Sequence, residues 1–166
     1  METTSETKTV QQPGFDSQEQ EVFLQLWRTY DCLKALEDQL FGKYDLSAQQ
    51  YNALRLLEAA APDGIQTMDL GRRMISRSPD TTRLIDRLEK RGFISRSRRE
   101  DNRRVVEISI SQAGLDLLRE MDAEVNEMNQ KQLGHLSAQQ QQQLVKLLRL
   151  ARKPHEDSTC DWLEIQ

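Results

Sequence analysis

Arginine dominates one segment of this chain, and its chemistry gives the first indication of function. Between Gly71 and Arg104 the sequence holds 12 Lys/Arg and 5 Asp/Glu residues, and 11 of those 12 basic residues are arginine. The rest of the chain carries 11 basic and 22 acidic residues. The planar guanidinium group fits phosphates and base edges better than solubility alone requires. An acidic body with a concentrated basic segment is typical of a nucleic-acid-binding protein.

Two of these arginines are spaced to share one face of a helix. Arg83 and Arg87 are four residues apart, so in a helix their side chains point in the same direction. From there both could reach DNA bases or phosphates. The alternative is that they form surface ion pairs with Asp80 or Asp86 on the same helix.

Other polar residues near this pair suit contacts with the phosphate backbone. Ser78 and Thr82 carry short hydroxyl side chains close to the start of the expected helix, where backbone N–H groups also attract anions. Arg77, just before that helix, is a further phosphate candidate. Arg96 and Arg98 are two residues apart, which places them on one face of a strand. We include all five in the predicted DNA-binding set.

Hydrophobic periodicity and turn residues predict the elements that position these side chains. A capping box is expected at Ser47 and Gln50, and a turn is expected from Pro62 to Gly64. Alternating apolar residues predict two short strands with a polar tip between them. Helices are expected over residues 16–41, 47–61, 67–74, 79–91, 112–133 and 137–152, and strands over residues 93–98 and 104–110.

The order of these elements predicts a mainly α fold with a small β-hairpin wing, a winged helix-turn-helix. A short helix and a tight break precede the arginine-bearing helix, and a hairpin with a basic tip follows it. A helix can enter the major groove, where each base pair presents a distinct pattern of donors and acceptors. The hairpin tip can reach the adjacent minor groove, where a narrow groove attracts arginine.

Residues 70–118 resemble the MarR family of transcriptional regulators. The resemblance lies in the stretch from Leu84 to Ile94, in the wing sequence Asp-Asn-Arg-Arg at residues 101–104, and in Gly114. The order of the flanking helices extends it over residues 15–152. The family is built as winged-helix dimers in which the first helix and the last two form the dimer interface.

The resemblance implies specific roles for the wing. Arg103 would enter the minor groove and Asp101 would hold its side chain through an ion pair, with Arg104 completing the DNA-binding set. The alternatives are a solvated wing tip for Arg103 and a simple turn residue for Asp101. Many members of the family are repressors that release DNA when a small phenolic or lipophilic ligand binds. We therefore expect a regulator of that kind that binds double-stranded DNA.

The expected organisation has five parts, and its terminal helices are expected to form a homodimer. These helices are too apolar to be lone surface helices, although an intramolecular bundle of them is the alternative. In chain order we expect a disordered arm (residues 1–14), an N-terminal dimerisation helix (15–46), the winged helix-turn-helix (47–111), two C-terminal dimerisation helices (112–153) and an acidic tail (154–166).

Four aromatic residues lie where the resemblance places an effector pocket, although the hydrophobic core is the alternative role for them. They are Trp27, Tyr30, Tyr44 and Tyr51. Cys32 is expected to be a buried structural residue, and a redox-active cysteine is the alternative. A loose group of His155, Glu156, Asp157 and Cys160 matches no strong zinc pattern, so we expect neither a metal nor a cofactor.

The sequence argues against several classes of function. It contains no glycine-rich phosphate loop or nucleophile elbow, so we expect no enzyme. It contains no apolar run of about 20 residues, no signal-peptide pattern and no disulfide framework, and we expect a cytoplasmic protein. The remaining alternatives are a winged helix used for protein interaction, an activator and an architectural DNA-binding protein.

Overall fold

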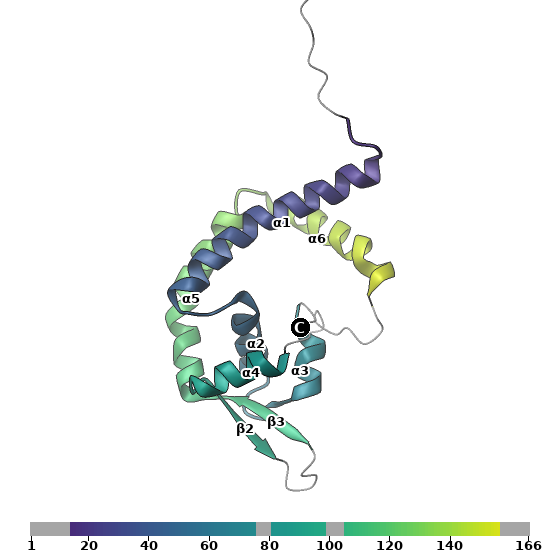
Figure 1. Ribbon diagram of the computed structural model, residues 1–166. Coiled ribbons are helices and arrows are strands. Elements are labelled where there is room, and N and C mark those ends of the chain that lie inside the picture. The colour runs from purple at the N-terminus through teal and green to yellow at the C-terminus, as the bar shows by residue number, and fades with distance from the viewer. Residues whose placement is uncertain (1–13, 76–80, 99–104, 157–166) are drawn as a thin grey trace, which may run out of the picture. The chain divides into compact units, whose positions relative to one another are not determined.

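A computed structural model describes residues 14–75, 81–98 and 105–156, and its elements confirm the predicted class (Figure 1). The described chain falls into two units that divide inside the first helix, after Ala35. In chain order the elements are α1 (Gln18–Lys43), α2 (Ala48–Ala59), β1 (Ile65–Gln66), α3 (Thr67–Arg73), α4 (Thr81–Lys90), β2 (Ile94–Arg98), β3 (Val106–Ile110), α5 (Gln112–Leu133), α6 (Ala138–Arg152) and a 3-10 turn (Lys153–His155).

Serine side chains cap the start of several described helices. At the start of α2, the Ser47 hydroxyl accepts from Gln50 N at 3.2 Å, and the Gln50 side chain accepts from Ser47 N at 2.8 Å. Ser137 and Gln140 form the same reciprocal pair at the start of α6. These bonds satisfy backbone donors that a helix leaves without partners. The predicted capping box at α2 is therefore confirmed.

The three strands form an antiparallel sheet in the order β1-β3-β2. Ile94 of β2 pairs with Ile110 of β3, and Ile65 of β1 pairs with Ile108 of β3. Figure 1 shows β2 and β3 as a hairpin that projects beyond the helices around it. The strand β1 was not predicted, because two residues are too few to show an alternating pattern.

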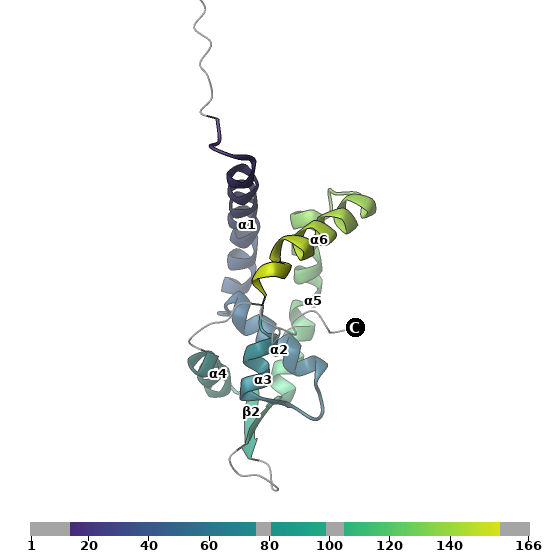
Figure 2. The same cartoon turned by 90° about the vertical axis from the view of Figure 1, so that its right-hand side faces the viewer.

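The hydrophobic core lies within residues 36–156 and joins α2, α3, α4, the sheet and α5. α2 is the centre of this core, since four of its apolar residues are buried; in the turned view of Figure 2, α4 lies on the outside of this helical group. The largest fully buried side chains are Leu54, Leu57, Leu70, Met74, Ile85, Leu88, Ile108, Leu118 and Met121.

The wing is fastened to the first turn of α5 by a close approach at Gly114. The Ser111 hydroxyl donates to Gly92 O at 2.6 Å and accepts from Gly114 N at 3.1 Å. A Cβ on Gly114 would collide with the carbonyl oxygen of Phe93 and would lie 2.8 Å from Cγ1 of Ile110. A side chain at this position would push the wing away from α5.

Ion pairs join α5 to the end of α1 and to α2. The Glu124 carboxylate accepts from Lys43 Nζ at 2.5 Å and from the Tyr44 hydroxyl at 2.7 Å. The bond from Lys43 and then the bond from Tyr44 lower the pKa of Glu124, whereas the bond to Glu124 raises the pKa of Tyr44 to about 12. Farther along the chain, Arg55 of α2 pairs with Asp122 of α5.

The first unit and α6 both leave apolar side chains exposed. Every described residue before Leu33 is exposed, and the aromatic rings of Phe23 and Trp27 lie 6.1 Å apart on that part of α1. None of the residues of α6 is buried. Across the described residues, no helix has the length and apolarity to cross a membrane.

We predict that Gly114→Ala destabilises the protein by about 1–3 kcal/mol, because the new methyl group must displace backbone and side-chain atoms in a packed junction. Gly42→Ala in α1 is the matched control, since no atom lies within 4 Å of a Cβ built there. Alanine's higher helix propensity predicts a gain of up to about 1 kcal/mol at Gly42. Urea unfolding followed by circular dichroism measures both changes, and equal effects would show that the close approach at Gly114 is unimportant.

Candidate nucleic-acid interface

Helix α4 has one buried apolar side and one exposed basic side. Ile85 and Leu88 are fully buried, whereas Thr82, Arg83 and Arg87 are exposed. Burial of the two apolar side chains stabilises the helix by roughly 1.5–3 kcal/mol each and fixes its rotation about its own axis. The structure therefore brings three of the predicted DNA-binding residues together on one outward surface.

Half of the predicted DNA-binding set lies outside the described residues. At the start of the expected recognition helix these are Arg77 and Ser78. At the wing they are Asp101, Arg103 and Arg104. Their assignments remain predictions, as does the alternative pairing of an arginine with Asp80.

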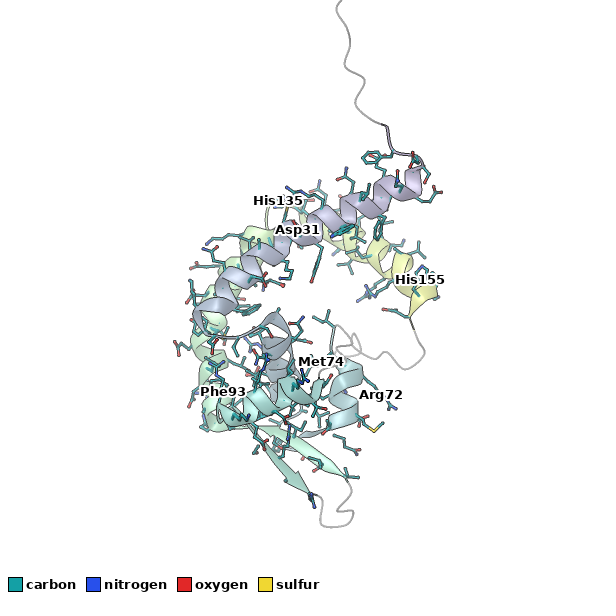
Figure 3. All side chains as sticks on the ribbon, in the orientation of Figure 1. Asp31, Arg72, Met74, Phe93, His135 and His155 are labelled. Atoms are coloured by element: carbon teal, nitrogen blue, oxygen red, sulfur yellow. The ribbon has the colours of Figure 1, made fainter. Side chains whose placement is uncertain are left out.

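The end of α3 is held from α2. Met74 closes α3 and is buried in the core, where Figure 3 marks it near α4. The side-chain oxygen of Asn52 in α2 accepts from Ile75 N at 3.2 Å. Ile75 itself is 66% exposed. One buried side chain and one hydrogen bond thus fix the end of α3 against the core and α2.

The end of α4 is anchored to the loop between α1 and α2. Arg91 donates to the carbonyl oxygens of Asp45 at 2.5 Å and Tyr44 at 2.9 Å. Its guanidinium carbon also lies 4.8 Å from the centre of the Phe93 ring, a cation–π distance. Gly92 has a φ of 76°, a left-handed conformation that glycine readily adopts where a helix ends. Arg91 is therefore part of the scaffold behind the recognition surface.

The two predicted arginines of β2 have different surroundings. Arg96 forms ion pairs with Asp86 at 2.5 Å and Glu89 at 3.2 Å, so Asp86 pairs with the wing. Arg98 is exposed and is the last residue of β2, next to the wing tip. Both residues are exposed, but the Arg96 guanidinium is paired with two carboxylates of α4.

Two exposed arginines of α3 were missing from the predicted set. Arg72 and Arg73 lie in the last turn of the helix, and Arg72 pairs with Asp69 at 3.4 Å. The first helix of a helix-turn-helix crosses the DNA backbone, where such side chains contact phosphates. Both residues were part of the basic segment, and their position at the end of a short helix could have identified them.

The four aromatic candidates for an effector pocket divide between the two units. Trp27 and Tyr30, in the first unit, are 61% and 60% exposed. Tyr44 and Tyr51, in the second, are half-buried against the core, and Tyr51 stacks on Phe41 with ring centres 4.7 Å apart. Tyr44 and Tyr51 therefore pack against the core, which is the alternative role given above for these aromatic residues.

A separate hollow lies between α1 and α5 within the second unit. It has a volume of about 120 Å³. Three apolar side chains line it together with lysine, glutamine and glutamate side chains. The lining residues are Leu36, Gln39, Leu40, Lys43, Glu124, Glu127, Met128 and Lys131.

The prediction that Cys32 is buried is wrong for the described chain. Cys32 is exposed, as is every described residue before it. In the loose acidic group near the C-terminus, His155 and Glu156 are described and exposed, whereas Asp157 and Cys160 lie outside the described residues.

Comparison with known proteins identifies the family. The sequence model of the MarR family matches residues 46–106. A MarR transcription factor from Planctomyces limnophilus is 48% identical and has a TM-score of 0.65, over 82% of this chain and 99% of that one.

Two more distant structures share the fold. Sco3205 from Streptomyces coelicolor, solved in complex with DNA, is 17% identical with a TM-score of 0.77, over 94% of this chain and 99% of that one. BpsR from Bordetella bronchiseptica is 23% identical with a TM-score of 0.74, over 87% of this chain and 100% of that one. On the strength of the Planctomyces relative and the family match, this chain belongs to the MarR family of transcriptional regulators.

Proposed function

We propose that this protein binds double-stranded DNA in a sequence-specific manner as a homodimer and represses transcription until a small effector binds. The observation that carries the proposal is the exposed basic side of α4, where Arg83 and Arg87 project from a helix whose other side is buried. Sco3205, which shares this fold, is described in complex with DNA. We assign residues 47–111 to DNA binding.

In this proposal α4 enters the major groove. Arg83 and Arg87 read base edges there, and Thr82 contacts the phosphate backbone. Arg77 and Ser78 at the start of the helix add further backbone contacts. Family membership supports these roles, because the helix that follows the turn is the reading helix of a helix-turn-helix.

The wing makes a second set of DNA contacts. Arg103 enters the minor groove with Asp101 holding its side chain, and Arg98 and Arg104 contact the adjacent backbone. Exposed Arg98 at the end of β2 supports this part of the proposal. Arg96 was also predicted to contact DNA, but its ion pairs with α4 suggest a different role, which is developed below.

Dimerisation through residues 15–46 and 112–153 explains the exposed apolar side chains of the terminal helices. In α1, Phe23, Trp27 and Tyr30 are each about 60% exposed, and in α6 Leu147 and Leu150 are 55% and 66% exposed. Apolar surface on this scale favours association. A two-fold dimer presents two recognition helices to half-sites about one helical turn apart.

The hollow between α1 and α5 is the place we propose for the effector. About 120 Å³ is enough for a single small ring. Lys43 and Glu124 line it, and Glu124 also accepts the hydrogen bond of Tyr44, whose carbonyl oxygen accepts from Arg91 at the end of α4. BpsR is described as regulated in its DNA binding by 6-hydroxynicotinic acid, a small aromatic acid. A phenolic or lipophilic effector of that size fits this hollow.

We predict that Arg83→Ala and Arg103→Ala each weaken DNA binding by about 1–3 kcal/mol, and that only Arg83→Ala also relaxes sequence preference. Arg119→Ala is the matched control, because Arg119 lies in α5 and pairs with Asp116 of its own helix. Gel-shift titrations with specific and scrambled duplexes measure both effects. Unchanged affinity for both variants would refute the residue assignment.

We predict that Leu147→Glu combined with Leu150→Glu converts the protein from dimer to monomer, because it places charges on an apolar contact surface. Gln142→Glu, in the exposed first part of the same helix, should leave the dimer intact. Size-exclusion chromatography with light scattering distinguishes the mass of two chains from that of one. A wild-type protein with the mass of one chain would contradict the proposal.

A further inference from the structure

Arg96 connects the wing to the recognition helix. Its Nη2 lies 2.5 Å from the Asp86 carboxylate and its Nη1 lies 3.2 Å from the Glu89 carboxylate. The Arg96 side chain is 29% exposed, and although the residue as a whole is exposed, both ion pairs direct its guanidinium toward α4. A single side chain of β2 therefore binds two acidic residues of α4.

The position of Arg96 along β2 suits this connection. Ile94, Arg96 and Arg98 alternate along the strand and so share one face of it. Ile94 is buried in the core, whereas Arg98 is exposed beside the wing tip. Arg96 lies between the two, at the point where the strand leaves the core. An attachment here controls the direction in which the remainder of the wing extends.

The two acidic residues lie beside the basic surface of α4. Asp86 is three residues after Arg83 and four before Lys90, so it neighbours both on the helix. Without a partner, the carboxylates of Asp86 and Glu89 would oppose the approach of a phosphate backbone. The guanidinium of Arg96 places a positive charge against both of them. It thereby preserves the positive potential of the recognition surface.

We propose that Arg96 is a positioning residue for DNA recognition, which holds the wing against α4 and neutralises Asp86 and Glu89 without contacting DNA itself. This inference rests on the proposed function, since it assigns Arg96 a part in the same recognition event. It replaces the direct DNA contact that the spacing of Arg96 and Arg98 predicted. Its effect on DNA binding depends on the two carboxylates, and that dependence makes it testable.

The test is a double-mutant cycle on DNA affinity. Four proteins are compared: wild type, Arg96→Gln, the pair Asp86→Asn with Glu89→Gln, and all three changes together. Each is titrated with a duplex that the wild-type protein selects from a random library. Arg96→Gln should weaken binding about tenfold in the wild-type background and less than twofold in the background that lacks both carboxylates, because the partners then no longer interact. An equal loss in both backgrounds would overturn the proposal.

Arg98→Gln is the matched control, because it lies on the same strand face beyond the ion pairs. Its loss of affinity should be the same in both backgrounds. The salt dependence gives a second readout: Arg96→Gln should keep the wild-type slope of log affinity against log salt, whereas loss of a phosphate contact lowers that slope by about 1. A reduced slope for Arg96→Gln would contradict the proposal.

Circular dichroism and thermal unfolding check that each variant is folded. Should Arg96→Gln fail to fold, Arg96→Lys takes its place, because lysine keeps the charge but lacks the fork that binds two carboxylates. It should lose two- to fivefold in affinity, and full retention would overturn the proposal. A wild-type protein that selects no DNA sequence would instead refute the proposed function itself.

Discussion

Burial of one side of α4 is the constraint on which the recognition surface depends. Ile85 and Leu88 are fully buried in the same cluster as Leu54 and Leu57 of α2. The helix cannot rotate about its axis without exposing them, so Arg83 and its neighbours must face outwards. The bonds from Arg91 to the carbonyl oxygens of Asp45 and Tyr44 hold the end of the helix. Recognition of specific bases needs this rigidity, because a side chain without a fixed position cannot discriminate between bases.

Charge in this protein is organised at two scales. Over the whole chain the net charge is −4, yet the segment that contains α4 and the wing is strongly basic. Within that segment, Asp86 and Glu89 would weaken the positive potential if Arg96 did not pair with both. The acidic remainder of the chain, together with such local pairing, confines attraction for DNA to one surface.

Much of the fold could be predicted from the sequence, because strong local patterns determine it. The capping pair of Ser47 and Gln50 and a helix within residues 79–91 both appeared in the structure as predicted. Strand β1 was missed, because its two residues exist as a strand only through pairing with β3. Cys32 was misassigned, since an apolar helical pattern predicts burial without showing what covers it.

The site was less predictable than the fold, because it depends on tertiary partners. The spacing of Arg96 and Arg98 correctly placed them on one strand face, but spacing contains no information about which helix packs beside it. Only the structure shows Arg96 against Asp86 and Glu89. Arg72 and Arg73 were missed for a different reason: they lie in the basic segment, in the last turn of a short helix, but the prediction considered only the helix that follows and the wing.

The central claim, that this chain is a specific DNA-binding regulator, is tested most directly by equilibrium binding to DNA from upstream of its own gene. A scrambled duplex of the same composition serves as the comparison, at two salt concentrations. The account predicts preference for the upstream DNA and an affinity that falls steeply as salt rises, because arginines that contact phosphates release counterions. Absence of binding to either duplex at low salt would contradict the account and would favour a winged helix used for protein interaction.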